Sequence, residues 1–62
     1  MINIKQLDGT ISVIKIDSIE DVFITKNSIV IAYKDGTRQQ YITGVSTGQL
    51  YTSIKVKLIN RR

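Results

Sequence analysis

Apolar and polar residues alternate through most of the first 43 positions, in short segments separated by glycine-containing turns. Such alternation is typical of half-buried β-strands, and an Asp-Gly pair between two alternating segments is a strong hairpin signal. Asp8-Gly9 and Asp35-Gly36 occupy such positions, and both predict two-residue turns of type I′. The pattern therefore predicts at least two antiparallel hairpins.

The turn type fixes the register of each hairpin, because residues paired across two strands share a face. A two-residue turn at Asp8-Gly9 places Ile4 opposite Val13. The predicted apolar face of this hairpin contains Ile2, Ile4, Ile11 and Val13.

A two-residue turn at Asp35-Gly36 likewise places Ile31 opposite Gln40. If Lys26-Asn27 also closes a two-residue turn, Val22 lies opposite Ile31 and the same apolar face extends to a third strand. The predicted core side of this second hairpin contains Ile29, Ile31 and Ile42.

The opposite face of the predicted hairpins is also apolar, and an open sheet would leave it in water. Closure into a small barrel, the C-terminal segment folding back, or another protein chain would cover it. The residues predicted to form a protein interface are Phe23, Val30, Ala32 and Tyr41 on this face, with Tyr33 at its rim. The alternative for all five is burial in the chain's own core.

Residues 49–60 fit two secondary structures. As a strand, the segment has a period-2 pattern rich in β-branched residues, and this is the favoured interpretation. Its apolar side would contain Leu50, Thr52, Ile54, Val56 and Leu58. As a helix, the segment has an apolar stripe of Leu50, Tyr51, Ile54 and Leu58, with Ser46 or Thr47 as its N-cap. We therefore expect one mostly β domain over residues 1–62, a curled or barrel-like antiparallel meander of about five strands. The alternative is a four-stranded sheet with a C-terminal helix.

The composition argues against catalysis. The chain of 62 residues contains no Cys and no His, so thiol, Ser-His and ordinary zinc chemistry are excluded. Of the five acids, Asp8 and Asp35 belong to turns, and the remaining three lack the spacing of a calcium loop. We expect no enzyme activity, no metal and no cofactor. A domain this small is also marginally stable, which favours self-association.

The net charge of +4 is unevenly distributed. Residues 1–36 carry four lysines against five acids, whereas residues 37–62 carry five basic residues and no acid. Such asymmetry indicates a polyanion contact, here a nucleic acid bound by a ribosome-associated or phage-encoded protein. The residues of this alternative are Arg38, Lys55, Lys57, Arg61 and Arg62. Lysines that protect an exposed edge strand from aggregation would give the same pattern.

Neither a secretion signal nor a membrane span is predicted. The segment "MINIKQLDG" lacks a basic stretch followed by an apolar one, and no apolar run reaches the roughly 18 residues of a span. The expectation is a cytoplasmic protein. Its expected function is a non-enzymatic interaction or structural role through a β-sheet surface, with itself or another protein as the partner.

The stretch "MINIKQLDG", followed by "DSIEDVFITKNSIVIAYKDG" and a short strand, resembles the FlbD/SwrD family of small flagella-associated proteins. Members of that family also open with Met-Ile, a short strand and an Asn/Asp-Gly turn, and reach a second Asn/Asp-Gly after a hydrophobic-acid pair. The resemblance covers residues 1–43 and implies a motility-associated role. The family's next segment is acidic and helix-like, whereas "VSTGQLYTSIKVKLINRR" is basic and β-branched, and no functional residue is carried over.

Overall fold

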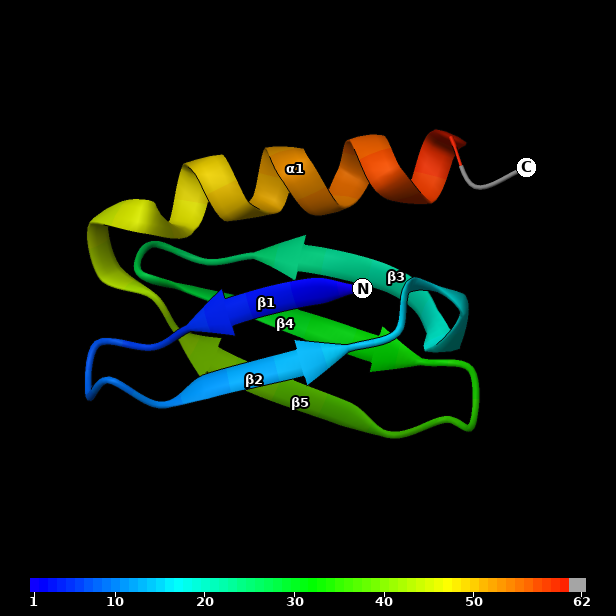
Figure 1. The fold of residues 1–62 in the computed structure, drawn as a ribbon, viewed down its shortest axis with the longest axis horizontal. Coiled ribbons are helices and arrows are strands. Elements are labelled where there is room, and N and C mark those ends of the chain that lie inside the picture. The colour runs from blue at the N-terminus through cyan, green and yellow to red at the C-terminus, as the bar shows by residue number, and fades with distance from the viewer. Residues whose placement is uncertain (61–62) are drawn as a thin grey trace.

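Five strands and one helix make up the fold in the computed structural model, which describes residues 1–60 (Figure 1). Of two short 3-10 turns, Ile16–Ser18 joins the second strand to the third, and Gly44–Ser46 joins the fifth strand to the helix. The regular elements are β1 (Ile2–Lys5), β2 (Ile11–Ile14), β3 (Ile19–Ile24), β4 (Ser28–Tyr33), β5 (Arg38–Ile42) and α1 (Thr47–Asn60).

The strands form two separate antiparallel sheets. The order β3-β4-β5 makes a three-stranded sheet, and β1 pairs only with β2. The β1-β2 hairpin lies over one face of the three-stranded sheet, and α1 runs beside the hairpin along β3 (Figure 1). We call this covered side the inner face and the opposite side the outer face. The core between the layers contains Ile2, Ile4, Ile14, Ile19, Val22, Ile29, Ile31, Tyr41 and Ile54.

The prediction of one curled or barrel-like meander is wrong, and so is the alternative of a four-stranded sheet. The chain leaves the first sheet at a 3-10 turn between β2 and β3, where Ser18 closes the turn. Its amide and its hydroxyl both donate to the carbonyl of Lys15, at 3.1 and 2.7 Å. This turn carries the chain from one layer to the other, so β2 and β3 do not pair.

The strand favoured for residues 49–60 is also wrong, because this segment is part of helix α1. The stripe considered for the helical alternative is the side that packs on the sheet. Ile54 is fully buried, and Leu50, Tyr51 and Leu58 pack against the core. A helix of 14 residues is marginal in isolation, so this packing against the sheet stabilises it.

The turns at the two Asp-Gly pairs are longer than predicted. In the first, the Gly9 amide donates to the Gln6 carbonyl at 3.0 Å, and the Gln6 amide donates to the Thr10 carbonyl at 2.8 Å. The loop therefore has three residues, and the glycine alone takes a positive φ, of 91°. A type I′ turn would require a positive φ at Asp8 as well.

The second turn repeats this geometry because it repeats the sequence Asp-Gly-Thr. The Gly36 amide donates to the Tyr33 carbonyl at 3.0 Å, and Gly36 has a φ of 92°. In both turns the aspartate Oδ1 accepts the amide of the threonine two residues later, at 2.9 Å. The threonine thus holds the carboxylate in a three-residue loop.

The extra loop residue shifts the second strand of each hairpin by one position relative to the first. A shift of one position exchanges the two faces of that second strand. In the first hairpin, Ile4 pairs with Ser12 and Ile2 with Ile14, and these isoleucines face the core. Ile11 and Val13, predicted in the core, are 61% and 60% exposed.

The second hairpin shows the same correction. Ile29 pairs with Tyr41, so Tyr41 faces the core and Ile42 lies on the outer side. The register predicted from the Lys26-Asn27 turn is confirmed, since Val22 pairs with Ile31. The inner face therefore gains a tyrosine where the sequence predicted an isoleucine.

The hydroxyl of the buried Tyr41 side chain has a hydrogen-bond partner. Its hydroxyl lies 2.8 Å from the hydroxyl of Tyr33, and its side chain is only 7% exposed. Burial, followed by the hydrogen bond to Tyr41, raises the pKa of Tyr33 well above its ordinary value. Tyr33 therefore stays protonated, and one hydroxyl donates to the other at the part-buried edge of the core.

Replacing Tyr33 with phenylalanine is expected to lower the free energy of unfolding by about 1 kcal/mol, because the Tyr41 hydroxyl loses its partner. Tyr41→Phe should cost a similar amount. The double variant should lose less than the sum of the two, because no unpaired hydroxyl remains. Urea denaturation of the four proteins measures this, and strictly additive losses would contradict the pairing.

Candidate protein-binding surface

The outer face of the three-stranded sheet carries two rows of side chains that the strand registers define. Asp21 pairs with Ala32, which pairs with Arg38, so these three residues form one row across the sheet. The neighbouring row consists of Phe23, Val30 and Gln40. We name Phe23, Val30 and Ala32 the sheet patch, since they are the apolar members of these rows.

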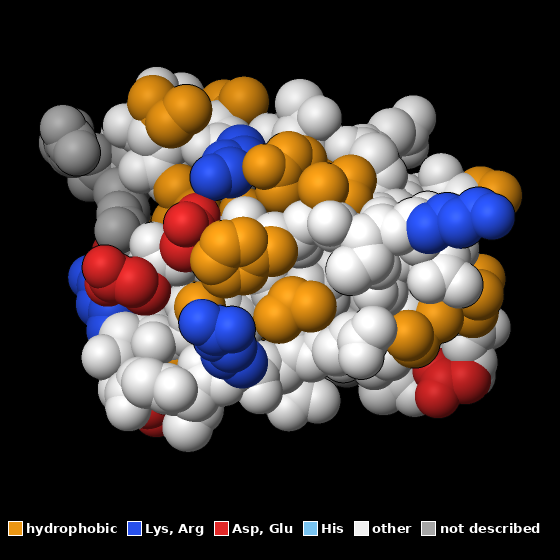
Figure 2. Space-filling view, turned by 180° about the vertical axis from the view of Figure 1, so that it is seen from behind, with side chains coloured by type: hydrophobic (Ala, Val, Ile, Leu, Met, Phe, Trp, Pro, Cys, Tyr) orange, Lys and Arg blue, Asp and Glu red, His pale blue; other side chains and the backbone are white. Residues whose placement is uncertain are grey.

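The sheet patch is partly open to solvent. The Phe23 side chain is 44% exposed, while Val30 and Ala32 are half-buried. The Arg38 guanidinium carbon lies 5.8 Å from the centre of the Phe23 ring, which is within the range of a cation-π contact. Figure 2 shows hydrophobic side chains in the middle of this face, with basic side chains above and below them.

An ion pair borders the sheet patch on the side of α1. Lys55 Nζ lies 3.1 Å from Asp21 Oδ1 and 5.8 Å from the centre of the Tyr51 ring. The Val22 amide, which donates to the same oxygen, and the Lys55 ammonium hold the pKa of Asp21 below its ordinary value. The hydrogen bond to Asp21 raises the pKa of Lys55 in turn. Both groups are therefore charged at neutral pH.

Polar groups close the other end of the patch. Gln40 Nε2 donates to Ser28 Oγ at 2.9 Å, and Ser28 Oγ also hydrogen-bonds Thr25 Oγ1. Ser28 is fully buried, so these bonds satisfy a hydroxyl that has no access to water. They also hold the Gln40 amide in place beside Val30.

The structure brings together three of the five residues predicted for a protein interface. Phe23, Val30 and Ala32 lie side by side on the outer face. Tyr33 and Tyr41 lie on the inner face, where their hydroxyls meet. The register shift explains the position of Tyr41, while Tyr33 follows from its alternation with Ile29 and Ile31 on β4.

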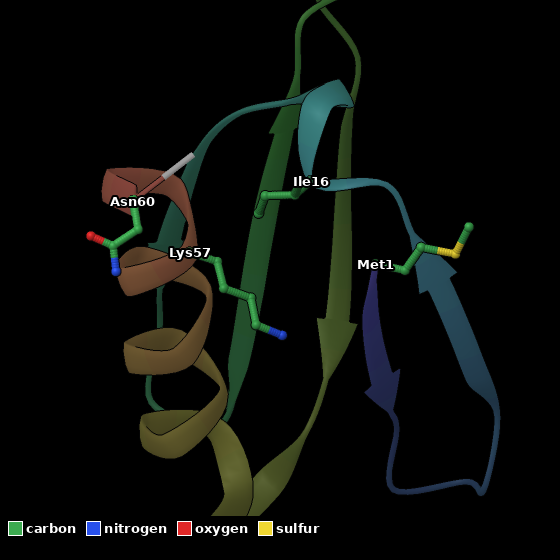
Figure 3. Close-up of a pocket in the computed structure, with 4 residues that line it drawn as sticks. All are labelled: Met1, Ile16, Lys57 and Asn60. Carbon is green, nitrogen blue, oxygen red and sulfur yellow. The ribbon is translucent and has the colours of Figure 1, made fainter. Parts of the chain in front are cut away.

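The residues predicted to bind nucleic acid do not share one surface. Arg38 and Lys55 flank the outer face, whereas Lys57 projects into a hollow between α1 and the β1-β2 hairpin (Figure 3). On a strand, Lys55 and Lys57 would point the same way, but two positions on a helix differ by about 200°. Arg61 and Arg62 lie outside the described residues.

The hollow in Figure 3 has a volume of about 320 Å³ and is lined by Met1, Ile16, Lys57 and Asn60. Lys57 is the one titratable side chain among these four residues. General acid-base catalysis and carboxylate-based hydrolysis both need further polar groups at the reacting position.

Residues 1–60 contain no cluster of three or more Asp, Glu, His or Cys side chains that could hold a metal ion. The two turn aspartates accept hydrogen bonds from Thr10 and Thr37. Over the same residues, α1 falls short of the length and apolar character that a membrane-crossing helix requires.

Sequence reasoning missed two members of the outer rows, Asp21 and Gln40. Sequence reasoning leaves Asp21 among three acids without a recognisable site, and a two-residue turn at Asp35-Gly36 places Gln40 opposite Ile31. The observed three-residue loop places Ala32 opposite Arg38 and Val30 opposite Gln40, and the Asp-Gly pair alone does not predict this register.

Comparisons with protein-family models, with curated proteins and with solved structures find no match for the chain. The resemblance of residues 1–43 to the FlbD/SwrD family therefore stays a prediction.

Proposed function

We propose that the chain is a small, non-enzymatic protein-binding module that self-associates through the sheet patch. The observation that carries this proposal is the row Asp21, Ala32 and Arg38, in which an acid and a base lie one strand to either side of an apolar centre. A surface with this arrangement is complementary to itself.

The row defines the symmetry of the contact. If two copies meet face to face about a twofold axis that runs along β4, each Asp21 lies opposite the partner copy's Arg38. Val30 then lies opposite Val30, and Phe23 lies opposite Gln40. Arg38, which covers its own Phe23 in the free chain, would extend to the partner's carboxylate and uncover the ring.

The size of the face sets the expected affinity. Three strands about 4.8 Å apart and five or six residues at about 3.4 Å each give a face of roughly 14 by 20 Å. This is well below the roughly 800 Å² per partner of a standard interface, so the dimer should be weak and concentration-dependent. The relevant dissociation constants lie in the range of about 10 μM to 1 mM.

The acids support a non-enzymatic role. Asp8 and Asp35 hold turns, and Asp21 is paired with Lys55 and the Val22 amide. A carboxylate held in such contacts keeps a low pKa and is a poor general acid or base at neutral pH. Three of the five acids are thus engaged in structure.

Replacing Phe23 with aspartate is expected to weaken self-association at least tenfold, because it removes the largest apolar side chain of the sheet patch and puts a charge in its place. Sedimentation velocity from about 10 μM to 1 mM measures the shift. Val13→Asp is the matched control: Val13 is exposed on the hairpin, far from the patch, and its variant should associate like the parent. Equal behaviour of the two variants would contradict the proposal.

A charge exchange tests the symmetry directly. Asp21→Lys and Arg38→Asp should each weaken the homodimer by about threefold or more, since like charges then meet twice. An equimolar mixture of the two variants should dimerise better than either alone, because both opposed pairs become attractive in the mixed dimer. A mixture that associates no better than its components would refute this geometry.

Nucleic-acid binding is the weaker candidate, because Lys57 lies apart from Arg38 and Lys55. Fluorescence anisotropy with a short labelled single-stranded oligonucleotide at low salt decides between the two. Binding that falls steeply with salt and is lost in Arg38→Asp would favour the nucleic acid over self-association.

A further inference from the structure

A second exposed apolar site lies at the end of the molecule where the first hairpin loop meets the turn before α1. Val45 is fully exposed, Leu7 is 68% exposed, and both border a hollow of about 300 Å³. We name it the loop hollow. It is lined by Lys5, Gln6, Leu7, Thr43, Val45 and Ser46.

Backbone hydrogen bonds fix the walls of the loop hollow. The Leu7 amide donates to the Ile42 carbonyl at 3.0 Å, and the Ile42 amide donates to Gln6 Oε1 at 3.3 Å. The Gly44 amide donates to the Asn27 carbonyl at 2.9 Å. Three segments distant in sequence are thus joined, and a preorganised site of this kind binds without a large ordering cost.

Close packing adds to this rigidity. Gly44 has a φ of 61°, and a Cβ at this position would lie 2.7 Å from a methyl group of Leu7. Leu7 therefore rests on the bare backbone of Gly44, on one side of the hollow. Val45 follows directly, with its side chain in solvent.

The polar groups of the loop hollow favour an anion. Lys5 is the one charged residue of the lining. The acid nearest to it in the loop, Asp8, accepts the Thr10 amide at 2.9 Å. Within residues 1–60, neither the Lys5 amine nor the Ser46 hydroxyl has a hydrogen-bond or ion-pair partner. An aliphatic wall and two unused donors suit a group that is apolar at one end and negatively charged at the other.

We propose that the loop hollow binds a partner protein segment that presents an aliphatic side chain beside a carboxylate. The aliphatic group packs between Leu7 and Val45, and the carboxylate accepts from Lys5 and Ser46. Such a segment is a chain end whose last residue is aliphatic, so that its free C-terminal carboxylate lies beside the apolar side chain. This site lies apart from the sheet patch and does not depend on self-association.

N-acetyl-leucine is a suitable probe, because it carries both groups and little else. Titration into the ¹⁵N-labelled chain, followed by amide chemical shifts, should give saturable changes at Lys5, Leu7, Val45 and Ser46. A ligand of this size should bind with a dissociation constant on the order of millimolar. N-acetyl-leucinamide, which lacks the carboxylate, should bind about two- to fivefold more weakly.

Three variants test the site. Val45→Ser should weaken probe binding at least fivefold, and Lys5→Gln about two- to fivefold, whereas Val13→Ser, at an exposed valine elsewhere, should leave it unchanged. All three positions are exposed, so the variants should fold. The proposal is overturned by shifts that do not saturate up to about 20 mM, by binding that Val45→Ser leaves intact, or by equal affinity for the acid and the amide.

Discussion

Replacing Ile54 with alanine is expected to lower the free energy of unfolding by about 2–5 kcal/mol. Ile54 is the fully buried residue of α1, and it belongs to the core between the two layers. Its truncation removes apolar contact and leaves a cavity where the helix meets the sheet. Because a domain of this length has a total stability of only about 3–9 kcal/mol, much of the folded population should be lost.

Urea denaturation followed by far-ultraviolet circular dichroism measures this loss. Val56→Ala is the matched control, because Val56 lies on the same helix but is 50% exposed. Alanine is a better helix former than valine, so this variant should be as stable as the parent or slightly more stable. If Ile54→Ala is unfolded in water, Ile54→Val should still show a loss of about 0.5–1.5 kcal/mol. Equal effects at positions 54 and 56 would contradict the docking of the helix.

Replacing Ile4 with alanine is the second large effect, with an expected loss of about 2–5 kcal/mol. Ile4 is fully buried on β1 and points between the layers. Val13→Ala, by contrast, should change the stability by about 0.5 kcal/mol or less, since Val13 is 60% exposed.

This pair of variants distinguishes the two registers of the first hairpin. A two-residue turn would place Ile4 and Val13 opposite each other on the core side, and both truncations would then be costly. With a three-residue loop, only Ile4 lies in the core. Comparable losses in both variants would therefore favour the two-residue turn and contradict the observed register.

The hairpins were predictable from sequence because alternation and Asp-Gly pairs are local signals. The registers were not, because the same Asp-Gly pair fits loops of two and three residues, and a difference of one residue exchanges the faces of a strand. For the same reason Phe23, Val30 and Ala32 were grouped correctly on one side of the sheet, while Tyr41 was not. In both three-residue loops the aspartate accepts the backbone amide two residues later, a bond that any residue except proline can supply.

The helix was harder to predict for a different reason. Ile54, Val56 and Ile59 are β-branched and give the segment a strand-like composition. The stripe that includes Leu50 and Leu58 fits both periods, so local pattern alone does not decide between them. Tertiary packing decides, since α1 lies beside the β1-β2 hairpin and buries Ile54 in the core.

The contact between the first hairpin loop and Ile42 bears on aggregation. Strand β5 is an edge of its sheet, and an unpaired edge can recruit strands from other molecules into fibres. The amide and carbonyl of Ile42 are already bonded to Gln6 and Leu7. By the alternation of an antiparallel strand, the backbone groups that face the same way belong to Gln40 and Arg38. The edge of β5 thus offers the backbone groups of only two residues, one of which carries a charged guanidinium, to a strand from another molecule. This edge is too short to seed polymerisation, so the first hairpin loop protects β5 from edge-to-edge association.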